Sequence, residues 1–407
     1  MPVRRPRTGY ISSMDIPALQ AALGEAQLDG WLIYDFHGQN PTAVTALGLA
    51  GHMLTRRWFY LVPRQGQPVA LLHAIEVGSF PAHVPGERRT YASWQSQRAE
   101  LGALLGRLRP GARIAMEYCP EGAIPYLSRV DAGALELVRT FGVEVVSSGE
   151  LVQRFLCRWD EAQVQSHRRA LEVIDSAKDE AFARVGAAHR KGEAPSETAI
   201  QGFLLERFAA AGLEADHAPI VAVNGHAGDP HYEPSEKTPT PIQPGDLLLI
   251  DLWARGKGPR DVYADITWVG FCGDRPPQKL EQIFRITADA RDKGVAALEA
   301  AHRERRTLRG FEVDRVVRDH IAAHGYGDRF VHRTGHSIGG NVHGDGANLD
   351  DLETHDVRPL VQGLGFSIEP GIYLPEEGLG VRLEIDVFLA EDGPKVFGKI
   401  QQELVRV

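Results

Sequence analysis

The 407-residue sequence predicts an α/β domain in residues 1–155 followed by an α+β domain in residues 156–407. Three observations support this division. The length suits two domains that each bury a core. Helical and strand patterns alternate as far as about residue 147. From Asp160 a long amphipathic helix begins, and after the helix that follows it strand patterns outnumber helical ones.

The first domain is predicted from short apolar strands that are separated by helical segments. Residues 1–13 precede any periodic pattern and are expected to form a loose extension. The predicted strands are Trp31–Tyr34, Trp58–Val62, Val69–His73, Ala112–Tyr118 and Val143–Ser147, and the predicted helices are Ile16–Ala26, Glu100–Leu108 and Ile124–Thr140.

The second domain begins with two predicted helices. In the first, apolar residues recur at three- and four-residue steps from Val164 to Val185. The second helix covers Glu197–Ala211 and is expected to end at Gly212. No Gly/Ser-rich linker marks the boundary between the domains, which we place near residue 156.

The composition excludes several classes of protein. Lysine and arginine number 45 against 54 acidic residues, and the net charge of −9 argues against a nucleic-acid partner. The three cysteines are widely spaced without a CxxC motif, which favours a reducing, cytoplasmic location over a disulfide framework. No apolar run reaches the length of a bilayer span, so we expect no membrane partner.

The segment HRTGHSIGGNVHG places three histidines among four glycines. His332 and His336 have the four-residue spacing of the zinc-binding HExxH helix, but Arg333 replaces its glutamate. Gly335 and the glycine pair that follows disfavour a helix, so a turn or strand end is expected. Histidine ligands on such a segment would need carboxylate partners from elsewhere in the chain.

Four acidic residues interrupt apolar, strand-like runs in the second domain: Asp251, Asp265, Glu369 and Glu384. Each could face water on a strand with one wet face. A buried, ionised carboxylate is costly unless it is paired or binds a cation. Few bases are nearby, Arg382 being the clearest, so four converging carboxylates would require multivalent cations.

A ligand set of carboxylates with one imidazole suits manganese, cobalt or iron better than a thiolate-bound structural zinc. Two divalent ions fit four carboxylates better than one ion does. Such a pair activates a water molecule and polarises a carbonyl group. The chemistry expected from these residues is hydrolysis of an amide or a related bond.

Seven motifs in this order resemble the pita-bread metallopeptidases, specifically the proline peptidases, which are Xaa-Pro dipeptidase (prolidase) and aminopeptidase P. The resemblance covers residue 156 to the end, and residues 14–155 more weakly resemble the creatinase-like N-terminal domain of that family. It implies a pita-bread catalytic domain. The motifs are Pro230-His231-Tyr232, Leu249-Ile250-Asp251, Tyr263-Ala264-Asp265-Ile266-Thr267, Thr334-Gly335-His336, Val342-His343, Ile368-Glu369-Pro370-Gly371-Ile372-Tyr373 and Gly380-Val381-Arg382-Leu383-Glu384.

The resemblance implies a role for each matching position. Asp265 and Glu384 would bridge two ions, and Glu369 would also take the proton of the attacking water. His231 and His343 would steady the scissile carbonyl and the developing oxyanion. The implied metal ligands are Asp251, Asp265, His336, Glu369 and Glu384, with Arg382 orienting the carboxylates from outside the ligand set.

Three departures from the family pattern bear on the substrate. The hairpin Trp253–Val262 is about three residues longer than usual. Leu252-Trp253 replaces a small residue, for which packing is the favoured interpretation. Gly344 replaces an acidic residue that commonly follows the Val-His motif. None of these departures removes an implied metal ligand.

The leading hypothesis is a peptidase that cleaves Xaa-Pro dipeptides or short proline-containing peptides, with manganese as the first choice of metal and cobalt, zinc or iron as alternatives. A dipeptidase is preferred to an aminopeptidase P, and a homodimer is the family habit. Methionine aminopeptidase is disfavoured because it resembles the second domain alone, and creatinase because it lacks the metal ligands. A non-catalytic binding module is disfavoured because all five ligand positions are present.

Overall fold

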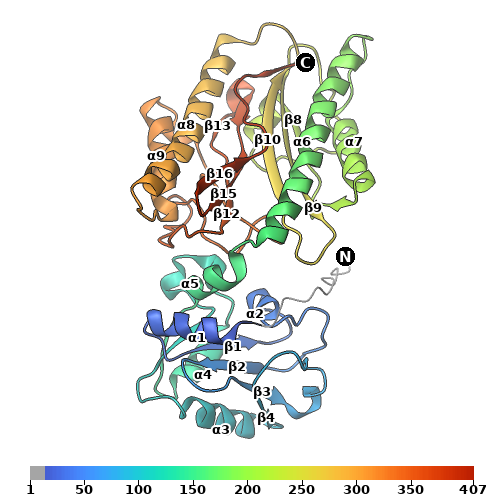
Figure 1. Ribbon diagram of the computed structural model, residues 1–407. Coiled ribbons are helices and arrows are strands. Elements are labelled where there is room, and N and C mark those ends of the chain that lie inside the picture. The colour runs from blue at the N-terminus through green and yellow to red at the C-terminus, as the bar shows by residue number, and fades with distance from the viewer. Residues whose placement is uncertain (1–13) are drawn as a thin grey trace. The chain divides into compact units, whose positions relative to one another are not determined.

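The computed structural model describes residues 14–407, which divide into two compact units, one ending at Leu156 and the other spanning Cys157–Val407 (Figure 1). The first unit is a mixed sheet with helices and the second combines curved sheets with long helices, so the predicted fold class is confirmed. The predicted extension at residues 1–13 lies outside the described residues. None of the helices within residues 14–407 combines the length and apolarity that a membrane crossing requires.

The first unit is built on a six-stranded sheet in the order β4-β3-β2-β1-β5-β6. Its central strands are buried along almost their whole length, which explains their continuous apolar runs. The strands are β1 (Gly30–Asp35), β2 (Trp58–Pro63), β3 (Val69–His73), β4 (Glu87–Tyr91), β5 (Arg113–Met116) and β6 (Glu144–Ser147). The helices are α1 (Ile16–Glu25), α2 (Pro41–Ala46), α3 (Trp94–Leu105), α4 (Ala132–Arg139) and α5 (Gly149–Val152), with a π-helical turn at Gln153–Cys157.

The strand predictions for this unit are confirmed, whereas two helix predictions are wrong at their boundaries. The helix predicted from Ile124 begins only at Ala132, because the side chain of Asp131 caps it by accepting from the Ala134 amide. The helix predicted from Glu100 begins six residues earlier, at a capping box formed by Ser93 and Ser96. The sequence patterns also missed β4 and α2.

The second unit contains two larger sheets, with strand orders β17-β10-β9-β7 and β11-β12-β15-β16, and the hairpin β13-β14. Strand β8 also pairs with β9. The strands are β7 (Leu213–Glu214), β8 (Ile220–Val223), β9 (Leu247–Gly256), β10 (Ala264–Phe271), β11 (Ser337–Ile338), β12 (Gly365–Ile368), β13 (Gly371–Leu374), β14 (Leu379–Arg382), β15 (Ile385–Ala390), β16 (Gly393–Phe397) and β17 (Val405–Arg406). The α-helices are α6 (Glu161–His189), α7 (Glu197–Ala210), α8 (Gln278–Arg303) and α9 (Gly310–Ala323).

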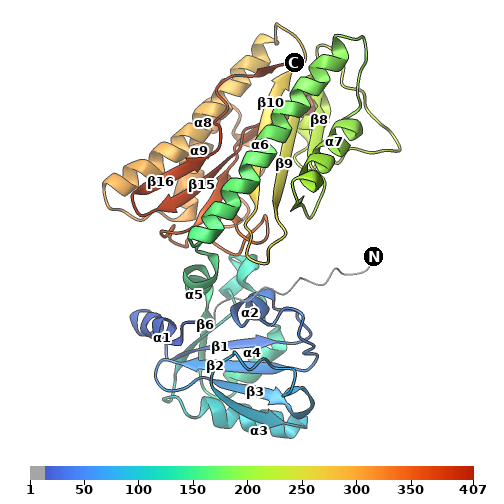
Figure 2. The ribbon, with the colours of Figure 1, turned by 45° about the vertical axis from the view of Figure 1, so that its right-hand side comes forward.

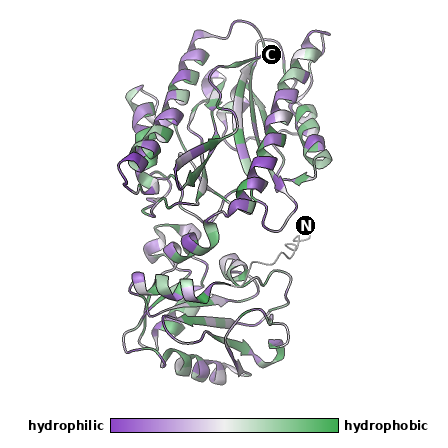
Figure 3. Ribbon diagram, viewed as in Figure 1, coloured by the Kyte–Doolittle hydropathy of each residue, from purple (hydrophilic) through white to green (hydrophobic). Residues whose placement is uncertain are grey.

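Figures 1 and 2 show α6 and α7 beside β9 and β10, with α8 and α9 on the side of β15 and β16. Helix α6 has buried residues from Val164 to Val185 at the predicted spacing. Its other face is hydrophilic, as is much of α8, whereas the central strands are mainly hydrophobic (Figure 3). Short 3-10 turns occur at Ala74–Glu76, Pro120–Gly122, Pro125–Leu127, Asn224–Gly228, Gly327–Arg329 and Pro375–Glu377.

Alternation along β9 separates two hydrophobic cores. Leu248, Ile250 and Leu252 pack in the core that contains α6 and α7. Leu247 and Leu249 pack on the other face, in the core that contains α8 and the β13-β14 hairpin. Because successive side chains of a strand point to opposite faces, the next odd-numbered residue continues on the α8 side. That residue is an aspartate, and it begins the polar centre of the unit.

The start of α6 provides a test of local stability. Asp160 caps this helix by accepting from the Gln163 amide at 3.0 Å and also forms an ion pair with Arg260. We expect Asp160→Ala to lower the free energy of unfolding by about 1–2 kcal/mol, because the cap is lost, and Asp160→Asn to lose much less. Urea titrations would measure both. The matched control is Glu172→Ala at an exposed position within the helix; an equal loss in this control would contradict the capping role.

Candidate metal centre

Two of the predicted ligands stand on neighbouring strands. Asp251 of β9 lies opposite Thr267 of β10, and Asp265 of β10 lies opposite Trp253 of β9. Directly paired residues of antiparallel strands project from the same face, so both aspartates lie on the face directed away from α6. Both are buried, with 7% of Asp251 and 4% of Asp265 exposed, so a simple solvated face does not account for them.

The two predicted glutamates lie where strands are interrupted. Glu369 follows β12 and precedes Pro370, and Glu384 lies between β14 and β15. The sequence interpretation placed both within strand-like runs; the structure places them in the breaks. The backbone amide of Glu369 donates to the Thr334 carbonyl, and that of Glu384 donates to the Thr267 carbonyl. These bonds fix the two breaks against the neighbouring segments.

His336 immediately precedes β11, which confirms a strand end rather than a helix. Its amide donates to Ser367 Oγ, and its Nδ1 lies 3.2 Å from the Ser337 carbonyl oxygen. The opposite ring nitrogen, Nε2, lies 3.5 Å from Asp265 Oδ2 and 3.4 Å from Glu369 Oε1. A backbone partner at Nδ1 leaves Nε2 as the ligand atom.

The arrangement has the properties of a divalent cation site. Ligand atoms of Asp265, His336 and Glu384 all lie within 4.8 Å of one another, and the three residues are buried. One oxygen each of Asp251, Asp265 and Glu384 is buried without a hydrogen-bond partner. Orphaned carboxylate oxygens beside an imidazole are a donor set that divalent ions satisfy. The residues therefore fit the predicted metal ions.

Electrostatics at the site follow from burial and from like charges. Burial raises the pKa of Asp265 well above its usual value, and the neighbouring Asp251 adds to the rise. Burial and then Asp265 raise the pKa of Glu384 in the same way. Burial also raises the pKa of Glu369, to about 7. Burial lowers the pKa of His336 well below its usual value, which keeps the ring neutral and able to bind a metal.

Arg382 connects the carboxylates to the surrounding structure. One guanidinium nitrogen donates to Asp251 Oδ2 at 2.5 Å, and another donates to the Tyr373 hydroxyl at 3.1 Å. The same hydroxyl lies 2.7 Å from Nε2 of His332. The structure thus places Arg382 where it orients Asp251, and it places His332 in a hydrogen-bond chain outside the group of ligand atoms.

The two histidines expected to face substrate are more exposed than the ligands. The ring of His343 packs edge-on against that of His336, with centroids 4.4 Å apart. His231 follows Pro230, whose carbonyl accepts from Arg382 at 3.3 Å, and the charge of His231 contributes to lowering the pKa of His343. Both histidines are exposed at the edge of the centre, and their roles remain a prediction.

Sequence reasoning missed a buried pair behind the ligands. Asp386 accepts from the Asp265 amide at 2.9 Å, and its carboxylate lies 3.6 Å from His167 of α6. The ring of His167 is held by the Tyr263 carbonyl at 2.7 Å. A signal was available, because His167 lies on the apolar stripe of its helix and Asp386 lies two residues after Glu384 in an apolar run. The pair supports the strand that carries Asp265.

Two basic residues ahead of Glu369 have partners of their own. The Arg358 guanidinium is buried against Asp356 and the Asp345 carbonyl, so it is not available to a substrate carboxylate. His355 is exposed and bonded to Asp351. The half-buried Arg333 acts on the centre electrostatically. Burial lowers the pKa values of His336 and His343, and the charge of Arg333 adds to this fall, whereas at Glu369 the same charge opposes the rise in pKa that burial causes.

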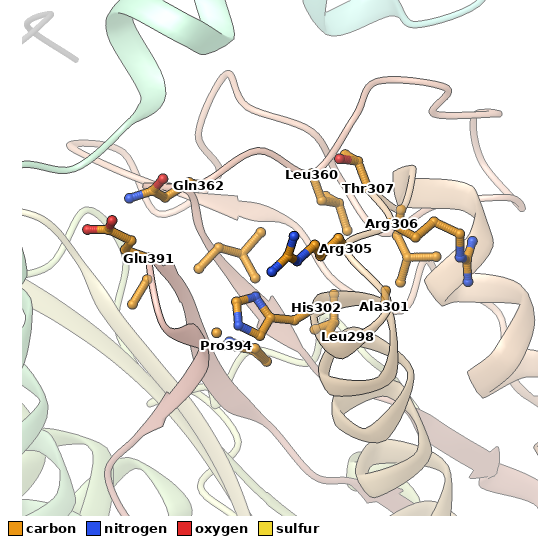
Figure 4. Close-up of a pocket in the computed structure, with 14 residues that line it drawn as sticks. Leu298, Ala301, His302, Arg305, Arg306, Thr307, Leu360, Gln362, Glu391 and Pro394 are labelled. Atoms are coloured by element: carbon orange, nitrogen blue, oxygen red, sulfur yellow. The ribbon is translucent and has the colours of Figure 1, made fainter.

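A separate cavity of about 300 Å³ lies around the C-terminal end of α8 (Figure 4). His302 and Arg305 lie near its centre, and Leu298 and Leu360 provide apolar lining. Within the described part of the chain, none of its lining side chains has a buried polar atom without a partner. It also contains none of the predicted site residues, so it is not the candidate centre.

The raised pKa values predict an unusual dependence of stability on pH. The metal-free folded protein holds protons on Asp265, Glu369 and Glu384 that the unfolded chain releases near pH 3.8 for the aspartate and pH 4.5 for the glutamates, and Glu369 keeps its proton to about pH 7. The folded state therefore binds more protons in this window, so the contribution of the cluster to unfolding free energy falls as pH rises. We expect the melting temperature of metal-free protein to fall between about pH 5 and pH 8.

Added Mn²⁺ should reverse this loss, most strongly at the upper end of the range, because metal ligands must be deprotonated. Calorimetric scans with a chelator and with Mn²⁺ would measure both effects. Glu384→Gln, which removes one of the raised groups, should flatten the metal-free profile. A metal-free wild-type protein of equal stability across the range would contradict the electrostatic account.

Comparison with known proteins places this geometry in a family. The Xaa-Pro dipeptidase of Lactobacillus helveticus is 35% identical over 156 residues, which cover 38% of this chain and 38% of that protein. Dipeptidase PepE from Mycobacterium ulcerans aligns over 96% of each chain with a TM-score of 0.73 and 25% identity. A prolidase from Thermococcus sibiricus aligns over 98% of this chain and 100% of its own, with a TM-score of 0.66 and 21% identity.

The likeness to the prolidase shows a shared fold, which confirms the predicted pita-bread architecture. The chain spans about half or less of the length of the first curated relatives that it matches. The sequence model of metallopeptidase family M24 matches residues 165–391, more than half of the chain. This range holds all five predicted metal ligands, and the chain belongs to metallopeptidase family M24.

Proposed function

We propose that this protein is a dinuclear-metal hydrolase that cleaves the imide bond of Xaa-Pro dipeptides. The observation that carries the proposal is the convergence of orphaned, buried carboxylates and a neutral imidazole in one centre. The names of its relatives, Xaa-Pro dipeptidase and prolidase, support the substrate class. Asp251, Asp265, His336, Glu369 and Glu384 are the residues that would hold the two ions.

When bound, the two ions would supply an activated water and an electrophile for the scissile carbonyl. Glu369 is the proposed proton carrier, because a carboxylate with a pKa of about 7 can both accept and release a proton near neutral pH. It would take the proton of the attacking water at Oε1 or Oε2 and pass it toward the leaving imide nitrogen. Ser367, which donates to Oε1 at 3.2 Å, would hold the group in place.

His231 and His343 are the proposed contacts to the scissile carbonyl and the developing negative charge. Their exposed position beside the ligands leaves their rings accessible to a bound peptide. Arg382 acts on the ligands rather than the substrate in this scheme, because two of its nitrogens are bonded to Asp251 and Tyr373. It would keep Asp251 in a fixed orientation.

Manganese is the proposed metal, since the ligand set is mainly carboxylate oxygen. A cytoplasmic homodimer is the proposed form, the location resting on three cysteines that are free in the structure. A peptide substrate rather than nucleic acid is consistent with the net charge of −9.

A single substitution tests the metal-dependent chemistry. Asp265→Asn keeps the size of the side chain but removes its charge, so we expect at least a hundred-fold loss of Xaa-Pro hydrolysis and fewer than two bound ions per chain. Activity with Mn²⁺ and metal content by mass spectrometry would be measured together. Asp274→Asn, an exposed aspartate after β10, is the matched control and should retain both properties. Full activity in Asp265→Asn would overturn the assignment.

Peptide length separates the proposed dipeptidase from an aminopeptidase P. The names of the relatives given above, Xaa-Pro dipeptidase, dipeptidase PepE and prolidase, favour a dipeptide substrate. We therefore expect Ala-Pro to be cleaved with a higher kcat/KM than Ala-Pro-Ala or longer peptides, with Mn²⁺, Co²⁺ or Zn²⁺. A preference for the longer peptides with every metal would instead indicate an aminopeptidase P.

A further inference from the structure

Trp253 starts from the same face of its strand as two of the metal ligands. It lies directly opposite Asp265 in the β9-β10 register and two residues after Asp251, so its side chain leaves the sheet on the same face as both aspartates. Its neighbours Leu252 and Ala254 leave on the opposite face and are fully buried, and Trp253 itself packs against the edges of both cores. The indole is only half-buried. The packing interpretation of Trp253 therefore does not account for its whole surface.

The far edge of this indole holds a second acidic group. Trp253 Nε1 donates to Asp216 Oδ1 at 2.8 Å, a contact between β9 and the segment that joins β7 to β8. The Asp216 side chain is 43% exposed, and its second oxygen lies 3.5 Å from His217, which is itself 73% exposed. The indole thus holds one oxygen of Asp216, and the carboxylate remains partly exposed to solvent.

The negative charge of Asp216 is not balanced by an arginine or lysine. The nearest basic residue on β9, Arg255, forms an ion pair with Glu214 at 3.1 Å and lies over the ring of Tyr263. Within residues 14–407, the structure shows no ion pair between Asp216 and a lysine or an arginine.

These contacts form a wall with defined chemistry. The indole is bonded to Asp216 at Nε1 and belongs to the residue that pairs with Asp265, so it presents an aromatic surface between the strand of a metal ligand and an exposed carboxylate. A lysine or arginine side chain places a long apolar stem along such a surface and its cationic head at the end. The head would gain both a charge-assisted hydrogen bond and a cation–π interaction.

We propose that Trp253 and Asp216 form the wall that receives the side chain of residue Xaa, and that this wall selects dipeptides with a basic residue before proline. The inference rests on the proposed Xaa-Pro dipeptidase function and names the substrate class of that site. The same carboxylate could in principle attract the α-ammonium group of any dipeptide. Asp216 is held at Nε1, the outer part of the indole, whereas the backbone of Trp253 pairs with that of Asp265, and this placement favours the longer side chain.

A pair of nearly isosteric substrates separates these two sources of positive charge. Lys-Pro and norleucine-Pro differ in the terminal ammonium group and share the α-ammonium group. For the wild-type protein loaded with Mn²⁺, we expect kcat/KM for Lys-Pro to exceed that for norleucine-Pro by about tenfold or more, which corresponds to about 1.4 kcal/mol. In Asp216→Asn this ratio should fall to about one, mainly through a higher KM for Lys-Pro.

Two further variants control the experiment. Asp274→Asn removes one exposed negative charge elsewhere and should leave the ratio at its wild-type value. Trp253→Phe keeps an aromatic ring but lacks the N–H group that holds Asp216, so it should reduce the ratio part of the way. Circular dichroism and metal content would establish that each variant is folded and loaded.

The outcomes are distinct. A wild-type ratio near one, or a ratio that Asp216→Asn leaves unchanged, would overturn the inference while leaving the proposed function in place. An equal fall in kcat/KM for both dipeptides in Asp216→Asn would show that the carboxylate binds the α-ammonium group. This outcome would also overturn the inference. Wild-type protein that cleaves neither dipeptide with Mn²⁺, Co²⁺ or Zn²⁺ would overturn the proposed function itself, and the inference with it.

Discussion

Repulsion between buried carboxylates is the constraint on which this structure depends. Asp251, Asp265, Glu369 and Glu384 converge from four segments, and the Arg382 guanidinium forms an ion pair with Asp251. One positive charge cannot balance four negative ones in a region of low dielectric constant. The folded chain without metal must therefore hold protons on these groups or remain under electrostatic strain. Either state is relieved when divalent ions bind.

The scaffold withstands this repulsion through rigid packing on the outside of the centre. Trp159 packs over Gly365, where an added methyl group would lie 2.0 Å from the indole, and Gly335 fits against the Ser367 carbonyl in the same way. These close contacts at the two glycines hold β12 and the segment before β11 in place, and with them the strand break that carries Glu369. The buried pair of His167 and Asp386 holds the backbone at Asp265. The four carboxylates can thus stay close together, because the tightly packed backbone segments that carry them cannot move apart.

Much of this centre could be predicted from the sequence, for reasons that particular residues show. Asp251 and Asp265 interrupt apolar runs, and a period of two places such residues on one face of a strand. The breaks at Glu369 and Glu384 could not be read in that way, because hydrogen bonds to distant carbonyls determine where a strand ends. The late start of α4 depended on a single cap at Asp131. The His167–Asp386 contact joins segments 219 residues apart, and no local pattern specifies such a pairing.

The position of Trp253 shows the same limit of sequence reasoning. Tryptophan in an apolar strand is usually core, and its sequence neighbours support that interpretation. Only the register, which sets it opposite Asp265, reveals that it shares a face with the ligands. The hydrogen bond from its indole to Asp216 then places an exposed carboxylate at a residue that shares a strand with Asp251. Under the proposal above, a peptide with a basic first residue would match this charge, and a neutral side chain in place of Asp216 would not distinguish such a peptide from an uncharged one.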